Sequence, residues 1–125
     1  MRVMIVDDNI ETLKILNDLL VTMNVSVAKF DNARAAAQHY SNNPNYDLVI
    51  TDFNMDGKNG EGLIFDIKYA NPNQKIFLLT GDSGNLNLPE DFKVLVFQKG
   101  DGIKPIISAI HEIFNKNKLP KTKVG

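Results

Sequence analysis

Short apolar runs alternate with segments of helical periodicity along the chain, and this rhythm limits the fold more than any other feature. The first of these runs is continuously apolar, as expected of a strand that is buried on both faces of a sheet. Five of them are present, over residues 3–6, 25–30, 48–51, 76–79 and 94–97. Strict alternation of strand and helix implies a parallel sheet with helices on both faces. We therefore expect an α/β protein with a five-stranded parallel sheet in a three-layer sandwich.

Helical patterns are clear in four of the segments that follow these runs and are weak in one. Apolar residues recur at helical spacing at Leu13, Leu16 and Leu20, at Leu63, Ile64 and Ile67, and at Ile103, Ile106, Ile107, Ile110 and Ile113. Asp31 is expected to cap an alanine-rich helix over about residues 33–40. Residues 81–91 hold two glycines, a proline and several Asn and Asp residues, all poor in helix interiors. We expect the fourth helix to be weak or distorted, or replaced by a loop.

Composition narrows the classes of protein. The chain has 125 residues, the usual length of one domain, and its net charge of −1 gives no general attraction to nucleic acid or membranes. It has no cysteine, which excludes disulfides and thiolate metal sites and fits a reducing, cytoplasmic setting. No apolar stretch is long enough to span a bilayer. We expect one domain over residues 1–117 and a flexible tail or linker over residues 118–125.

Polar side chains follow four of the five predicted strands. Asp7 and Asp8 come after the first strand, Asp52 after the third, Thr80 after the fourth and Lys99 after the fifth. In open parallel sheets, ligands bind outside the carboxyl ends of the strands. Three carboxylates brought together there repel one another unless a cation neutralises them. The residues alone therefore suggest a divalent metal and chemistry on a phosphate group.

These residues, in this order, resemble the receiver domain of two-component response regulators, over about residues 2–117. The residues that carry the resemblance are Val6, Asp7, Asp8, Asn9, Asp52, Phe53, Asn54, Met55, Gly60, Thr80 and Lys99. The resemblance implies a flavodoxin-like (βα)5 fold with strand order 2-1-3-4-5. In that order the first strand lies beside the third, which would place Asp8 against Asp52.

The resemblance also implies a magnesium site. Asp8 and Asp52 would bind Mg²⁺ directly, together with the backbone carbonyl of Asn54, and Asp7 would act mostly through a coordinated water. A few carboxylates, several waters and a phosphate oxygen are ligands that suit Mg²⁺ in proteins.

The phosphoryl chemistry that the resemblance implies centres on Asp52, which would be the phosphoacceptor. Lys99 would pair with the phosphoryl group, and Thr80 would hydrogen-bond one of its oxygens. The donor would be a sensor histidine kinase or a phosphotransfer protein, and the output a changed contact with a protein effector or a phosphorylation-linked dimer. The chain would be no enzyme beyond phosphoryl transfer to, and hydrolysis from, its own Asp52.

Four positions depart from the family pattern. Asp56 stands where a proline usually follows the methionine, and Gly81 where an alanine usually follows the threonine. Gly100 replaces the usual proline after the lysine, and because a non-proline cis bond costs ~2.5–4 kcal/mol, we expect a trans bond or another loop geometry. Val96 occupies the place of the aromatic switch residue, and Phe97 is expected to face the opposite side of its strand.

Two other functions remain as alternatives. One is a pseudo-receiver, a phosphorylation-independent interaction module, which the departures at Gly100 and Val96 favour and the complete set of acids opposes. The other is a phosphatase or phosphotransferase of the dehalogenase type, which needs an acid where this chain has Asn54 and a cap domain that the sequence lacks. His39 and His111 are expected to be surface or boundary residues. The sequence contains no DNA-binding motif and identifies neither the kinase nor the output partner.

Overall fold

The computed structural model describes residues 1–55, 60–81 and 88–118, which form a five-stranded, fully parallel sheet. Its strands are β1 Arg2–Val6, β2 Ser26–Phe30, β3 Leu48–Asp52, β4 Ile76–Thr80 and β5 Leu95–Gln98. They lie in the order β2-β1-β3-β4-β5. Both the predicted fold class and the predicted strand order are confirmed.

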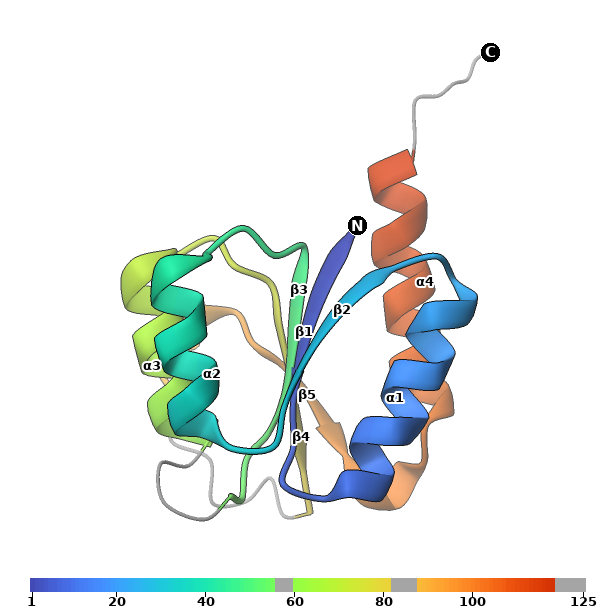
Figure 1. Ribbon diagram of the computed structural model, residues 1–125, viewed down its shortest axis with the longest axis horizontal. Helices are drawn as coiled ribbons and strands as arrows, with labels where there is room; N and C mark the ends of the chain where they lie inside the picture. The colour runs from blue at the N-terminus through green and yellow to red at the C-terminus, as the bar shows by residue number, and fades with distance from the viewer. Residues whose placement is uncertain (56–59, 82–87, 119–125) are drawn as a thin grey trace.

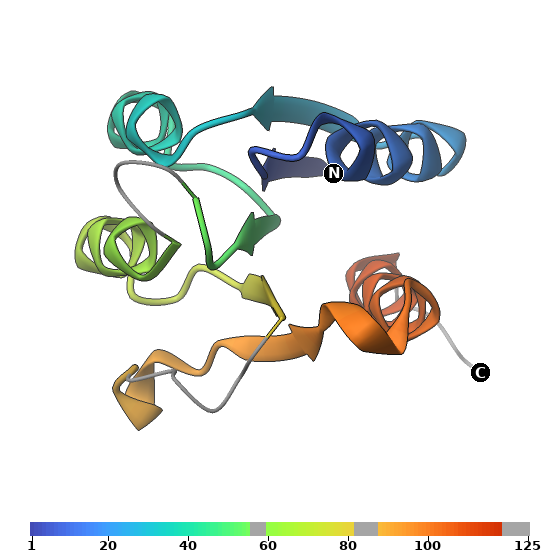
Figure 2. The same ribbon diagram turned by 90° about the horizontal axis from the view of Figure 1, so that it is seen from below.

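Helices cover both faces of this sheet. The α-helices of the described residues are α1 Ile10–Thr22, α2 Ala33–Asn42, α3 Gly60–Ala70 and α4 Lys104–Lys118. Figure 1 and Figure 2 show α1 and α4 on one face and α2 and α3 on the other, which is the predicted three-layer sandwich. None of them is long and apolar enough to cross a membrane. Because α4 ends at Lys118, the predicted tail falls almost wholly outside the described residues, and the domain boundary stays a prediction.

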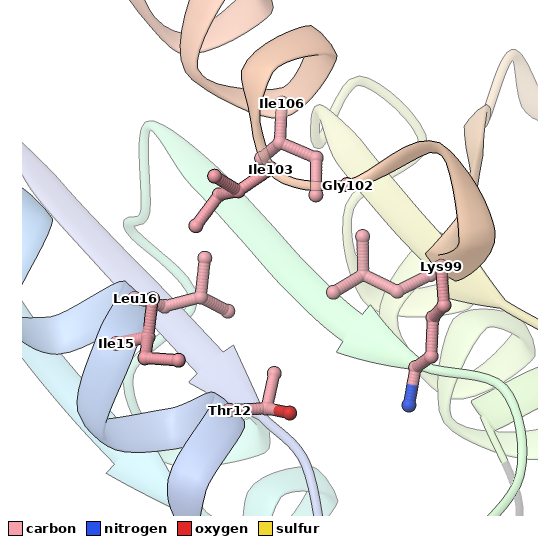
Figure 3. Close-up of a pocket in the computed structure, with 8 residues that line it drawn as sticks. Thr12, Ile15, Leu16, Lys99, Gly102, Ile103 and Ile106 are labelled. Atoms are coloured by element: carbon pink, nitrogen blue, oxygen red, sulfur yellow. The ribbon is translucent and has the colours of Figure 1, made fainter.

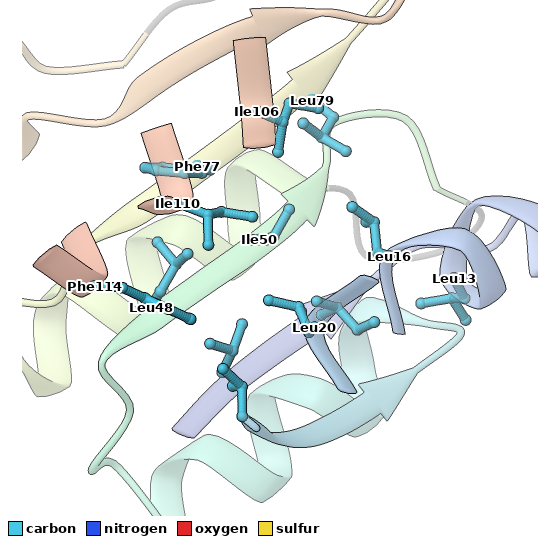
Figure 4. Close-up of a cluster of buried hydrophobic side chains, with 13 residues drawn as sticks. Leu13, Leu16, Leu20, Leu48, Ile50, Phe77, Leu79, Ile106, Ile110 and Phe114 are labelled. Atoms are coloured by element: carbon cyan, nitrogen blue, oxygen red, sulfur yellow. The ribbon is translucent and has the colours of Figure 1, made fainter. Parts of the chain in front are cut away.

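Successive residues of the central strands belong to two different cores. In β1, Val3 and Ile5 join the core under α1 and α4, whereas Met4 and Val6 join the core under α2 and α3. Side chains alternate across a strand, so a strand covered on both faces must be apolar at nearly every position. Figure 4 shows the first core, where leucines of α1 and isoleucines of α4 meet the sheet.

The connection between β4 and β5 is the irregular part that the sequence predicts. Its described residues contain a single short 3₁₀ helix, η2 Glu90–Phe92, and residues 82–87 lie outside the described part of the chain. The ring of Phe92 packs edge-on against Phe65 of α3, with centroids 5.1 Å apart. The described part of this segment is thus held on the core by Phe92, together with the partly buried Leu88 and Val94.

The cap of α2 differs from the prediction. Asn32, not Asp31, is the N-cap residue, and its side-chain oxygen accepts a hydrogen bond from the backbone amide of Ala35 at 2.7 Å. The helix begins at Ala33. A capping side chain must lie immediately before the first helical residue to reach the backbone amides of the first helical turn. Asp31 instead accepts a hydrogen bond from the Asn32 side-chain amide.

Candidate functional site

Three carboxylates meet at the carboxyl ends of two neighbouring strands. Val6 of β1 pairs with Thr51 of β3, so the residues that follow them, Asp7 and Asp52, lie side by side. Asp7, Asp8 and Asp52 each offer an oxygen, and these atoms all lie within 4.8 Å of one another. Asp7 and Asp52 are only 1% and 3% exposed, whereas Asp8 is exposed. The structure therefore brings together the three acids that the sequence predicts.

Asp7 has one oxygen engaged and one left over. Its Oδ1 accepts a hydrogen bond from the backbone amide of Asn9 at 2.9 Å, whereas its Oδ2 is buried without a hydrogen-bond partner among the described residues. Burial, followed by the charges of Asp52 and Asp8, raises the pKa of Asp7 to about 6, against the opposing effects of the Asn9 hydrogen bond and Lys99. A buried carboxylate oxygen with no donor is an arrangement that a metal cation or its water satisfies.

Lys99 reaches the acids from the end of β5. Its Nζ lies 3.1 Å from Oδ1 of Asp52 and 3.7 Å from Oδ2 of Asp7, and its side chain is 38% exposed. The residue opens a short 3₁₀ helix, η3 Lys99–Asp101, and the described residues contain no cis peptide bond. The expected trans bond before Gly100 is therefore confirmed, and it leaves the ammonium group within reach of Asp52.

The two remaining candidates lie on the same edge of the sheet. Thr80 ends β4 and is fully buried; the residue before it, Leu79, pairs with Asp52. Asn54 follows β3 by two residues and its side chain is exposed. The roles of the Thr80 hydroxyl and of the Asn54 carbonyl stay predictions.

Comparisons with known proteins agree with this geometry. The sequence model described as the response regulator receiver domain matches residues 3–95. The chain belongs to this family. A search of curated protein sequences found no match.

Solved structures resemble this receiver domain closely in fold. Response regulator TrrA from Thermotoga maritima, in complex with Mg²⁺–BeF, is 24% identical with a TM-score of 0.77, over 90% of this chain and 97% of that chain. CheY in the CheX–CheY–BeF3–Mg complex of Borrelia burgdorferi is 21% identical (TM-score 0.78, 92% and 90% covered). A receiver domain protein from Clostridium thermocellum is 24% identical (TM-score 0.80, 96% and 98% covered). At these identities the likeness shows the fold.

The structure shows why position 60 holds a glycine. It is the first residue of α3, and its amide donates a hydrogen bond to the Phe53 carbonyl at 2.8 Å. A Cβ at this position would overlap the Asp52 carbonyl oxygen and lie 2.8 Å from the Phe53 Cα. Only glycine lets the start of α3 approach the end of β3 this closely.

We expect Gly60→Ala to destabilise the receiver domain by about 1–3 kcal/mol, because a methyl group against rigid backbone forces α3 away from β3. Chemical denaturation measures the loss. Gly100→Ala is the matched control, because no atom of the residues that the structure describes lies within 4 Å of a Cβ there. Equal stability of the two variants would contradict the close packing at Gly60.

The departures from the family pattern have different outcomes. Val96 is 38% exposed, whereas Phe97 packs on Phe77 with ring centroids 5.0 Å apart, so the two residues face opposite sides as predicted. Among the described residues, no atom lies within 4 Å of a Cβ placed at Gly81. Asp56 lies outside the described residues. The usual aromatic position on β5 thus presents a small, exposed aliphatic side chain.

A cavity of about 290 Å³ lies beside the acids, between α1 and the start of α4. Ile15 and Leu16 line one side and Ile103 and Ile106 the other, with Lys99 at the rim (Figure 3). Its lining contains no carboxylate. The receiver domain therefore offers a polar site and an adjoining apolar hollow that share a single lysine.

His39 lies away from these groups. Its Nε2 is 2.6 Å from the Tyr46 hydroxyl, and its ring packs against Phe30. This boundary position agrees with the prediction.

No role was predicted for Asn9 from the sequence. A capping residue type directly before a helical pattern is nevertheless the signal for a helix cap.

Proposed function

We propose that this receiver domain is a phosphorylation-dependent signalling switch that accepts a phosphoryl group on Asp52 in a Mg²⁺-dependent reaction. The observation that carries the proposal is the buried pair of Asp7 and Asp52, with an Asp7 oxygen that has no hydrogen-bond partner among the described residues and the ammonium group of Lys99 3.1 Å from Asp52. Buried acids this close are costly in a purely structural role. A site for a divalent cation and a phosphate accounts for them.

The donor set suits Mg²⁺. Asp8 and Asp52, with the backbone carbonyl of Asn54, would hold the ion directly, and Asp7 would act through a coordinated water. The oxygens of the three acids lie within 4.8 Å of one another, and two structurally similar receivers were solved with Mg²⁺ and a beryllofluoride. When bound, the ion offsets the charge that collects on the phosphoryl oxygens.

The protein's own residues perform the transfer. An oxygen of the Asp52 carboxylate attacks the phosphorus of a phosphorylated histidine on the donor protein. The phosphorus–nitrogen bond breaks, its electron pair stays on the imidazole, and an aspartyl phosphate forms. Water later attacks the same phosphorus, the bond between phosphorus and the Asp52 oxygen breaks, and inorganic phosphate leaves, which restores the carboxylate. The chain thus acts on its own side chain and not on a metabolite.

Lys99 and Thr80 respond to the new group. The ammonium group of Lys99, now paired with Asp52 and Asp7, pairs instead with the phosphoryl oxygens, which carry about −1.5 to −2 charge. The Thr80 hydroxyl donates a hydrogen bond to one of these oxygens. Thr80 is the last residue of β4 and Lys99 directly follows β5, so their movement alters the surface at this end of the sheet, which a protein effector or second copy binds.

A sensor histidine kinase or phosphotransfer protein is the donor that fits the surroundings of Asp52. An apolar side chain of such a protein could bind in the cavity beside Lys99, next to Asp52. The exposed side chain of Ile15 at its rim extends the apolar surface on α1.

The alternative is a pseudo-receiver whose contacts do not depend on phosphate. Val96 in place of an aromatic residue favours it, as does the short η2 among the described residues between β4 and β5. The two functions separate in one comparison. A phosphoryl adduct that changes neither partner binding nor oligomeric state would support the pseudo-receiver.

Incubation with a small acyl phosphate and Mg²⁺, followed by intact-mass measurement, tests the proposed switch. We expect the mass to rise by one phosphoryl group with Mg²⁺ present and to stay unchanged with a chelator. A chain that gains no phosphoryl group under either condition would disprove phosphoacceptor function.

A further inference from the structure

Two successive turns, held by three hydrogen bonds between side chains and the backbone, connect the acid cluster to α1. Oδ1 of Asp7 accepts from the Asn9 amide at 2.9 Å, and Oδ1 of Asn9 accepts from the amides of Glu11 at 2.9 Å and Thr12 at 3.2 Å. The first bond, and the one from Glu11, each join a side chain to the backbone two residues on, which is the geometry of an Asx turn. Asn9 therefore takes part in both turns, through its backbone in one and its side chain in the other.

The turn closed by the Asn9 side chain fixes the backbone conformation that the turn closed by the Asp7 side chain needs. Asn9 is the N-cap residue of α1, with extended backbone angles of −88° and 110°. Its side chain satisfies two amides of the first helical turn, which otherwise lack intrahelical partners. The backbone of Asn9 is thus held in one orientation, with its own amide directed at Asp7.

The hydrogen bond from the Asn9 amide to Asp7 also decides which oxygen of Asp7 is available. Because Oδ1 is occupied by the Asn9 amide, Oδ2 is the atom left buried, 3.7 Å from Lys99 Nζ and without a hydrogen-bond donor in the part of the chain that the structure describes. The backbone of Asp7 is also held, because its amide donates a hydrogen bond to the Phe30 carbonyl of β2 at 3.1 Å. The Asp7 carboxylate cannot rotate freely while both bonds are in place.

Asp8 depends on the same turns in another way. It lies between Asp7 and Asn9, and its side chain is exposed, so packing does little to hold it. Its position relative to Asp52 follows from the backbone that the two turns enclose.

We propose that Asn9 is a positioning residue for the metal site, and that its capping side chain presents Asp7 Oδ2 and the Asp8 carboxylate to Mg²⁺. The inference rests on the proposed function, because it concerns the ion which that function requires. Groups that orient metal ligands typically change metal affinity ~10–100-fold when removed. Asn9 would do so without touching the ion.

Mg²⁺ titration of the full chain by isothermal calorimetry, together with thermal unfolding in chelator, tests this role. We expect Asn9→Ala to weaken Mg²⁺ binding about tenfold, and Asn9→Ser, which keeps a capping oxygen, to bind nearly as well as the original chain. Asn32→Ala is the matched control. It removes the cap of α2, which lies on the opposite face of the sheet from α1, and should lower the unfolding temperature while leaving Mg²⁺ affinity unchanged.

Three outcomes would overturn the inference. Unchanged Mg²⁺ affinity in Asn9→Ala would show that the residue only caps its helix. Equal weakening in Asn32→Ala would show that affinity merely follows overall stability. Equal weakening in Asn9→Ser and Asn9→Ala would show that capping is not the cause. In each case the original chain still binds Mg²⁺, so the proposed function stands; if the original chain binds none, both fail together.

Discussion

Asp52→Asn is expected to abolish the phosphoryl adduct completely. The substitution keeps the size and shape of the side chain but removes the charged oxygen that attacks phosphorus. It also removes one of the three acids proposed to hold the metal and the 3.1 Å ion pair with Lys99. Intact mass after exposure to a small acyl phosphate and Mg²⁺ should show only the unmodified chain.

The substitution should leave the fold intact, because it relieves the repulsion between two buried acids. Asp52 is 3% exposed and contributes a charge that raises the pKa of its neighbour Asp7. An exposed aspartate on α1 provides the control: Asp18→Asn should be phosphorylated like the original chain, because Asp18 pairs only with Lys14 among the described residues. A phosphoryl group that persists in Asp52→Asn would place the acceptor at another residue.

Chain order and burial made much of this molecule predictable from its sequence. A continuous apolar run such as residues 48–51 indicates a strand covered on both faces, and the alternation with helices makes the strands parallel. Parallel strands deliver their ends to one edge, so the meeting of Asp7, Asp8 and Asp52 followed from their places after two strands that proved to be neighbours.

Local backbone geometry was less predictable. The reach of Lys99 depends on the 3₁₀ turn η3, whose shape no periodic pattern encodes. The cap of α2 could not be assigned because Asp31 and Asn32 are both suitable capping residues and lie side by side. Only the exact start of the helix, at Ala33, makes Asn32 the cap. The double turn at Asn9 needs the position of two amides, which a residue type alone does not give.

The stability of the metal-free protein is expected to fall as the pH rises from about 4 to about 6, by as much as roughly 3 kcal/mol from Asp7 alone. Folding raises the pKa of this carboxyl from 3.8 to about 6, chiefly through burial. Between these values the folded chain keeps a proton that the unfolded chain has lost, so the folded state is favoured less with each step up in pH. The stabilisation is complete below pH 3.8 and lost once the pH passes about 6.

Asp7→Asn should remove this dependence and reveal what the acid is for. In chelator near neutral pH, denaturant unfolding should find the variant more stable than the original chain, because no buried charge remains at this position. Its Mg²⁺ affinity should nevertheless be ~10–100-fold weaker, and should no longer rise with pH toward about 6, since the ion requires a deprotonated carboxylate. A variant that is less stable in chelator, or that binds Mg²⁺ as tightly as the original chain, would mean that Asp7 serves the fold and not the ion. Opposite changes in stability and affinity are the signature of a group retained for binding at a cost to the empty fold.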